Sequence, residues 1–162
     1  NHDLALERWL KEQDYRRDPV NALFFLEMQL RNYQAMTRGE KLETFKAACE
    51  LVHGSSLDNV TFMKTDESFR MHGIEFGSHG HNGNGGARGS VRAFQIQGVK
   101  TNLGHSHSAH IKDGVYQAGA LMLPEDSGYA KGGTAWSISH IVTYANGKRA
   151  IITCKNGKWR AK

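Results

Sequence analysis

Two short histidine clusters, each containing glycine, constrain this chain more than any other feature of its sequence. They are Ser78-His79-Gly80-His81 and Gly104-His105-Ser106-His107, and six of the nine histidines lie in residues 72–110. Strand-like runs at 74–77 and 100–103 lead into the two clusters. Residues i and i+2 of an extended chain share a face, and open α/β sheets place ligands at strand ends. We therefore expect both clusters to line one site.

The residue type indicates what such a site would bind. Neutral imidazole is a common ligand of zinc, iron, nickel and manganese ions. The alternative explanation is that surface loops rich in glycine and serine simply tolerate histidine. That explanation is sufficient for a single histidine, but two clusters at two strand ends favour a metal site.

A glycine-rich loop runs from His81 to Gly89, directly after the first cluster. Loops of this kind let backbone amides approach a phosphate, and a helix expected from Ser90 adds the positive end of its dipole. Arg88 is placed to bind phosphate oxygens through two guanidinium nitrogens. The glycines can equally serve to wrap the chain tightly round His79. The two explanations are compatible, and both stay open.

Hydrophobic periodicity divides the chain into a helical segment and a strand-rich part. In residues 1–52 we expect three helices, starting at Leu4 after an Asp3 cap, at Pro19 after an Asp18 cap, and near Leu42 after a capping box at 37–40. Beyond residue 53 the period becomes that of strands, apart from one short helix at 91–97.

The expected strands end in a C-terminal hairpin series. Besides the two runs before the histidines, we expect strands at 60–63, 69–72 and 114–119. Two Asn-Gly pairs then indicate an antiparallel meander with strands 134–145, 148–155 and 158–161. We therefore predict an α+β fold in a single domain, residues 1–162, with a helical segment (1–52) and a β-rich part (53–162).

Composition limits the partners of this domain. The net charge of +5 and pI near 9.3 favour a polyanion such as nucleic acid. No apolar run approaches the roughly 20 residues that span a bilayer, so we expect no membrane partner. Cys49 and Cys154 follow no metal-ligand spacing, and we expect buried free thiols in a cytoplasmic protein.

Together with Asn1-His2-Asp3, the two clusters resemble the calcineurin-like metallophosphoesterases, whose motifs Gly-Asn-His-Asp/Glu, His-Gly and Gly-His-x-His are matched in this order from Asn1 onward, without the first glycine. The resemblance covers roughly residues 1–160. It implies part of an αββα sandwich, in which two sheets are flanked by helices. It also implies two divalent metal ions, for which manganese is favoured and zinc, iron and nickel are alternatives.

The resemblance also implies which residues act as metal ligands. Asn1, His79 and His105 would hold one ion of the pair. His107 would reach the second ion.

The remaining roles concern the substrate. His2 would lie beside the scissile phosphate as a catalytic residue, with Asp3 as the partner of its ring. Arg88 and His81 would bind the substrate.

One departure from the family pattern concerns its first two motifs. Asp-x-His and Gly-Asp-x-x-Asp belong upstream of Asn-His-Asp, and neither occurs in this chain. The carboxylate that bridges the two ions in the family is therefore absent. We expect the chain to be the second half of a longer polypeptide, to hold at most one ion well, and to be catalytically poor until its missing N-terminal half is added as a partner.

These features predict a metal-dependent phosphoesterase. The stretch from His79 through the glycine-rich loop looks most like bacteriophage members of the family, so a DNA phosphodiesterase or nuclease in the host cytoplasm is favoured. A small phosphoester or phosphoprotein substrate would share the same site, and oligomeric state stays open. The alternative from another class is a non-catalytic nucleic-acid-binding or assembly module on the same scaffold.

Overall fold

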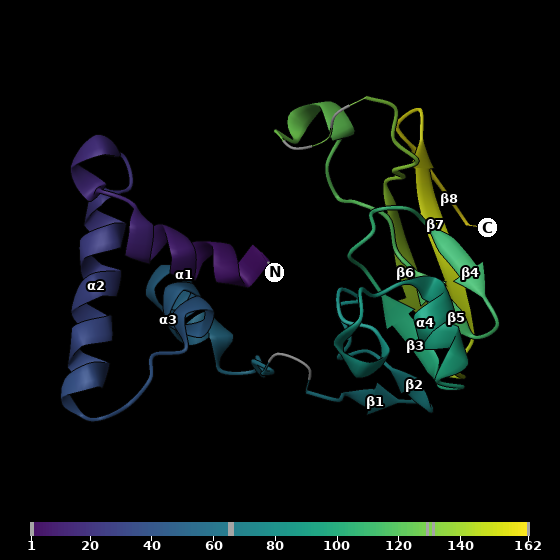
Figure 1. Cartoon of the computed structure of the whole chain (residues 1–162), viewed down its shortest axis with the longest axis horizontal. Coiled ribbons are helices and arrows are strands. Elements are labelled where there is room, and N and C mark those ends of the chain that lie inside the picture. The colour runs from purple at the N-terminus through teal and green to yellow at the C-terminus, as the bar shows by residue number, and fades with distance from the viewer. Residues whose placement is uncertain (1, 65–66, 129, 131, 162) are drawn as a thin grey trace. The chain divides into compact units, whose positions relative to one another are not determined.

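The computed structural model describes residues 2–64, 67–128, 130 and 132–161, and it divides the chain into two compact units, Asn1–Phe62 and Met63–Lys162 (Figure 1). The first unit contains the three long helices, and the second contains every strand that the described residues form. The boundary between the two units follows Phe62, and the last helix of the first unit, α3, ends at His53. That the two units make up a single domain stays a prediction.

The first unit is built from α1 (His2–Glu12), α2 (Ala22–Thr37) and α3 (Thr44–His53). Its core is formed by fully buried Met28 with Ala47 and Ala48, against which apolar residues of all three helices pack. Trp9 meets the edge of Phe25 at 5.1 Å between ring centroids, which fixes α1 against α2. No helix in the described part of the chain combines the length and apolar character needed to cross a membrane.

The predicted starts of these helices are wrong for local reasons. Asp3 lies inside α1, which already begins at His2. Asp18 accepts a hydrogen bond from the backbone N–H of Asn21 through its own carbonyl, so Pro19 lies in a turn and α2 begins at Ala22. The expected capping box at 37–40 is instead the end of α2, because Gly39 adopts a left-handed φ of 72°.

The second unit contains a five-stranded mixed sheet in the order β1-β2-β3-β5-β4. Its strands are β1 (Arg70–Met71), β2 (Ile74–Glu75), β3 (Lys100–Leu103), β4 (His110–Lys112) and β5 (Val115–Gln117). The central strands β2, β3 and β5 run parallel, and the edge strands β1 and β4 pair antiparallel. The short helix α4 (Val91–Ile96) lies between β2 and β3 in the chain, close to its predicted range.

The C-terminal residues form a separate antiparallel sheet of β6 (Ser139–Thr143), β7 (Arg149–Lys155) and β8 (Lys158–Ala161). The predicted meander is therefore confirmed, with a later start for its first strand. Residues 60–63 form no strand, which contradicts the prediction. The edge strand β4 was not predicted, because all three of its residues are exposed and show no apolar alternation. The described residues thus form an α+β structure.

The two sheets and α4 make three layers within the second unit. Phe94 of α4 packs with Leu103 and Val115 on one face of the mixed sheet. On the other face, the guanidinium of Arg149 donates to the carbonyl of Gly114 at 2.7 Å and lies 4.1 Å from the ring centroid of Tyr116. Arg149 therefore fastens the antiparallel sheet to the mixed sheet.

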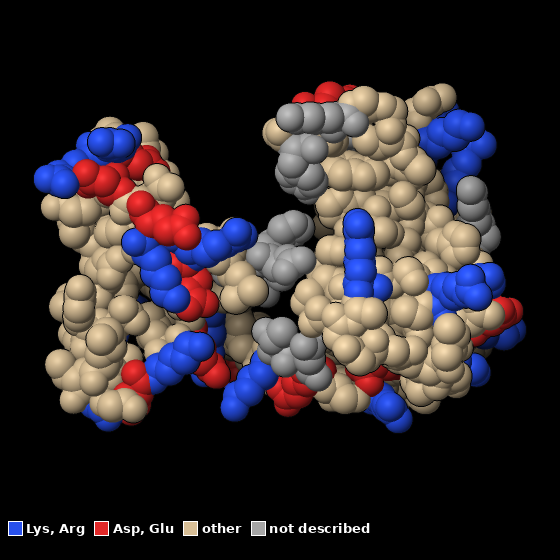
Figure 2. All heavy atoms as spheres, in the orientation of Figure 1, with Lys and Arg blue, Asp and Glu red and all other residues tan. Residues whose placement is uncertain are grey.

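Charges on the helical unit are mixed in sign. Figure 2 shows Lys and Arg side chains there interspersed with Asp and Glu. Exposed ion pairs join Lys11 to Glu7 at 2.8 Å and Arg38 to Glu40 at 2.9 Å. Such exposed pairs contribute little to stability and leave no strong field of one sign on this unit.

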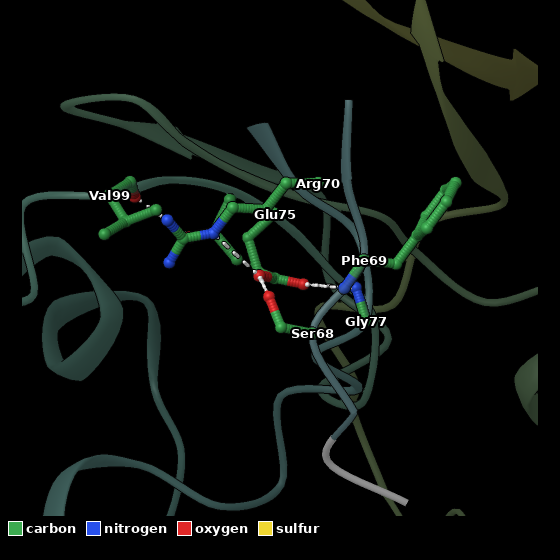
Figure 3. Close-up of polar contacts among 7 residues, drawn as sticks. Ser68, Phe69, Arg70, Glu75, Gly77 and Val99 are labelled. Atoms are coloured by element: carbon green, nitrogen blue, oxygen red, sulfur yellow. Dashed lines mark hydrogen bonds and ion pairs between the residues drawn. The ribbon is translucent and has the colours of Figure 1, made fainter. Parts of the chain in front are cut away.

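The buried carboxylate of Glu75 joins the backbone and side chains on either side of the first two strands of the mixed sheet (Figure 3). The Oε1 atom of Glu75 accepts from the backbone N–H groups of Phe69 at 3.0 Å and Gly77 at 2.7 Å. Its Oε2 atom accepts from the Ser68 hydroxyl and from Arg70 Nε. Burial raises the pKa of Glu75, but these hydrogen bonds outweigh burial and hold the pKa below its usual value.

This geometry predicts that Glu75→Gln destabilises the chain by about 2 kcal/mol at neutral pH, because an amide cannot accept all four hydrogen bonds. The folded-state pKa of Glu75 lies below its unfolded-state value of about 4.3, so the stabilisation is complete above that pH. It is lost as pH falls through the lower folded-state pKa. Chemical denaturation at neutral and acidic pH measures this difference.

The matched control is Glu125→Gln, which removes an exposed carboxyl of the same unit. We expect its free energy of unfolding to stay within about 0.5 kcal/mol of the parent chain. Equal stability of the parent and Glu75→Gln at neutral pH would contradict the assigned role of the Glu75 carboxylate.

Candidate functional site

Three histidine rings meet at the ends of two neighbouring parallel strands. His79 and His81 follow β2, and His105 follows β3. Ring centroids are 5.2 Å apart for His79 and His105, 5.4 Å for His79 and His81, and 6.0 Å for His81 and His105. The Gly104 N–H donates to the His79 carbonyl at 3.0 Å, so the chains remain paired beyond the strands. Three of the four histidines of the two clusters therefore lie close together, and we call these three residues the imidazole cluster.

The second histidine motif adopts an unusual backbone. His105 has a φ of 66° and His107 a φ of 61°, both in the left-handed region that non-glycine residues rarely occupy. The Ser106 N–H donates to the Gly104 carbonyl at 2.9 Å within the same turn. Left-handed residues of this kind cost about 1 kcal/mol or more each and cluster at functional sites. The turn therefore holds His105 at the end of β3 against a local energetic preference.

The glycine-rich loop folds back on the imidazole cluster. The Gly89 N–H donates to the His81 carbonyl at 2.8 Å, and Gly83 donates to the Ala87 carbonyl at 2.7 Å. A Cβ atom on Gly89 would lie 1.8 Å from the Gly80 carbonyl oxygen. Glycine at position 89 is therefore required for the tight wrap, which supports that explanation of the loop. Phosphate binding by exposed Arg88 stays a prediction.

The electrostatics of the cluster suit a ligand, such as a metal ion, that binds the lone pair of an imidazole nitrogen. The Nδ1 atom of His81 is buried and has no hydrogen-bond partner in the described residues. Burial lowers the pKa of His105, and electrostatic interaction with the neighbouring His81, His107 and Arg88 lowers this pKa further. His105 is therefore held in the neutral form, which is the form that coordinates metal ions.

The ring spacing also fits a shared ion. A tetrahedral ion about 2.1 Å from each coordinating nitrogen would space the imidazole centroids by about 5 Å. Among the described residues, however, no three His, Cys, Asp or Glu side chains already surround a point where an ion would bind. The donor type and ring spacing fit, and binding would require the rings to rotate about their side-chain torsions.

The structure adds a residue that the sequence pattern did not reveal. The ring of His107 meets the edge of Trp136 at 4.3 Å between centroids. The Ser137 N–H donates to the His107 carbonyl at 3.1 Å. The Ser137 hydroxyl accepts from the Ala109 N–H at 3.0 Å. Trp136 and Ser137 thus position the loop that carries His107. Only tertiary pairing brings them there, so no local sequence signal could identify them.

The three N-terminal site residues, Asn1, His2 and Asp3, belong to the first unit. Asn1 lies outside the described residues, and His2 and Asp3 belong to the first turn of α1 in the helical unit. Their metal-binding and catalytic roles stay predictions. The structure brings together His79, His81 and His105, and it places His107 on the same turn as His105.

The contact at Gly89 predicts that Gly89→Ala destabilises the second unit by about 1–3 kcal/mol, because the added methyl overlaps the Gly80 carbonyl. Chemical denaturation measures this loss. Gly128→Ala is the control, since a Cβ there meets nothing within 4 Å. If the two variants were equally stable, Gly89 would not be required for the wrap of the loop.

Comparison with known proteins identifies one related protein. The chain is similar to Protein A1 of Escherichia phage T5, with 44% identity over 166 aligned residues that cover 99% of this chain and 29% of that protein. No protein-family model matches the chain, and no solved structure is significantly similar to it. The chain is therefore homologous to a bacteriophage protein and spans somewhat less than a third of its length.

Proposed function

We propose that this chain carries the histidine-rich part of a metal-dependent phosphoesterase that acts on DNA. The observation that carries the proposal is the imidazole cluster, in which His79, His81 and His105 meet at the ends of two adjacent parallel strands. The three layers of the second unit, α4, the mixed sheet and the antiparallel sheet, also agree with part of the αββα sandwich of metallophosphoesterases.

The proposed roles follow from the resemblance and from the positions of the side chains. His79 and His105 would coordinate one divalent ion together with Asn1, and His107 would coordinate a second ion. Ions bound there would lower the pKa of a water nucleophile and neutralise charge on the phosphoester oxygens. Burial keeps His105 neutral and able to coordinate, and Trp136 holds the ring of His107 in place.

The residues around the ions would bind and orient the phosphate. Arg88 is exposed at the end of the glycine-rich loop, where its guanidinium can bind two phosphate oxygens. His81 lies within the cluster, so it can serve either the substrate or the ion through its buried Nδ1 atom. His2 would donate a proton to the leaving oxygen, with Asp3 orienting its ring.

Two observations support DNA as the substrate. The net charge of +5 favours a polyanion over a small neutral ligand. The related protein comes from a bacteriophage. Because the chain spans 29% of that protein, the activity, substrate and localisation of the whole polypeptide are part of this proposal.

A non-catalytic nucleic-acid-binding module is the second candidate. It is favoured by the absence, among the described residues, of three metal-binding side chains that already surround one point. On this alternative the imidazole cluster is part of a metalloenzyme fold that no longer binds metal. A chelator would then leave the affinity for nucleic acid unchanged.

The proposal predicts that the chain binds manganese or zinc in a stoichiometric ratio and that His105→Ala lowers the affinity at least tenfold. Removing one of the few coordinating nitrogens costs a large share of the metal-binding free energy. Elemental analysis and isothermal titration measure stoichiometry and affinity. His110→Ala is the control, because this exposed histidine on β4 lies outside the imidazole cluster, and we expect it to bind metal normally.

Cleavage is tested with a phosphodiester and with DNA, first with the chain alone and then after adding a polypeptide that contains the two upstream motifs. We expect weak cleavage alone and strong metal-dependent cleavage by the combined halves. No stoichiometric metal in either sample would overturn the phosphoesterase proposal in favour of the binding module. Two bound ions without phosphoester cleavage would overturn the assigned chemistry.

A further inference from the structure

The charge of this chain is unevenly distributed along its sequence. Seven of the 21 Lys and Arg residues follow Asp126, and none of the 16 Asp and Glu residues does. The preceding part therefore has 14 basic and 16 acidic residues and is slightly negative. The excess positive charge of the chain thus lies entirely in its last 36 residues, 127–162.

This stretch contains the antiparallel sheet, whose strands and turns carry four exposed cations. Lys148, Lys155, Lys158 and Arg160 are exposed, whereas Arg149 is turned toward the mixed sheet. The ion pairs found among the described residues include none of them. Figure 2 shows blue side chains and no red ones where β7 and β8 are joined.

An exposed aromatic pair lies on the same sheet. Trp159 on β8 is 50% exposed, and its ring centroid is 5.0 Å from that of His140 on β6, with a tilt of 33° between the planes. Trp159 is opposite Cys154, and His140 is opposite Ile152, so the two rings meet across β7. This pair leaves aromatic surface accessible on a strand that also carries two exposed cations, Lys158 and Arg160.

The arrangement of β8 lets rings and cations act on one ligand. All four residues of β8 are exposed, and the strand pairs with β7 alone among the described strands. Lys158 and Arg160 flank Trp159 in sequence, and their side chains therefore leave the opposite face of this edge strand. A nucleic-acid strand along the edge can place its phosphates near these cations and turn a base onto the Trp159 ring.

We propose that Trp159 and His140, with Lys155, Lys158 and Arg160, form a binding platform for single-stranded DNA on the C-terminal sheet. Single strands fit this surface because their bases are free to stack on an aromatic ring, whereas bases in a duplex are already stacked on each other. The choice of DNA over RNA rests on the proposed phosphodiesterase function. The platform itself rests on the charge pattern and the aromatic pair.

Fluorescence anisotropy of a labelled dT12 strand, measured with the whole chain in EDTA, tests the platform separately from metal chemistry. We expect Trp159→Ala to weaken binding about tenfold or more, because one stacked base is lost. Trp159→Phe, which keeps a π-face, should retain most of the affinity, and Trp159→Leu, which keeps only apolar bulk, should not. The matched aromatic control is Tyr33→Ala, since Tyr33 is 63% exposed on α2 in the helical unit.

The cations are tested by the salt dependence of binding. Lys158→Gln combined with Arg160→Gln should reduce the slope of log affinity against log salt by about 1.4, because each phosphate contact on a single strand contributes about 0.7. Arg17→Gln combined with Lys41→Gln removes the same charge from the helical unit and should leave the slope nearly unchanged. Circular dichroism of every variant confirms that the chain is folded.

Three results would overturn the proposal. They are equal affinity of the parent and Trp159→Leu for dT12, tighter binding of a duplex than of dT12, and loss of self-association rather than of DNA binding in Trp159→Ala. The last result would identify the surface as a protein interface. Tighter binding of rU12 than dT12 would overturn the choice of DNA. Since EDTA removes any metal, failure of this binding and failure of the phosphoesterase proposal are separate results.

Discussion

The buried carboxylate of Glu75 is the interaction on which the second unit depends. It accepts four hydrogen bonds from residues on both sides of β2, so β1, β2 and the turn toward His79 form around one anion. A buried anion is expensive unless it is fully hydrogen-bonded, and here the bonds are numerous enough to lower its pKa. The direction in which the chain leaves β2, and therefore the position of His79, follows from this network.

The imidazole cluster follows from parallel pairing and from a costly turn. β2 and β3 run side by side, so the chains that leave them bring His79 and His105 together without any long connection. The left-handed backbone at His105 and His107 would be unfavourable in isolation. Pairing of Gly104 with His79, and of Ser137 with His107, holds the turn in that form. Two strands and one loop contact thus position the cluster before any ligand is present.

Local sequence signals predict the parts of this structure that local interactions form. Ser90 caps α4 by accepting from the Ala93 N–H, and Asn-Gly pairs close the C-terminal hairpins, so these elements lie near their predicted places. The start of α2 and the strand β4 were mispredicted because a turn at Asp18 and the exposure of β4 override periodicity. The contact of Trp136 with His107 is tertiary, and no alternation or spacing in the sequence encodes it.

The excess positive charge of this chain lies in its C-terminal residues and not in the imidazole cluster. This separation determines which part of the chain would attract a polyanion. In the absence of a bound ion, the neutral imidazoles of the cluster add no long-range attraction for phosphates, because they are uncharged. Attraction for phosphates must then come from cations elsewhere, and the exposed ones of the antiparallel sheet lack acidic neighbours in the described ion pairs. Arg149 joins that sheet to β3 and to the turn before β5, so the basic surface and the cluster belong to two sheets that are linked directly. A strand held by the sheet would therefore raise the local concentration of phosphodiesters around the cluster, and salt would weaken this effect far more than it weakens coordination itself.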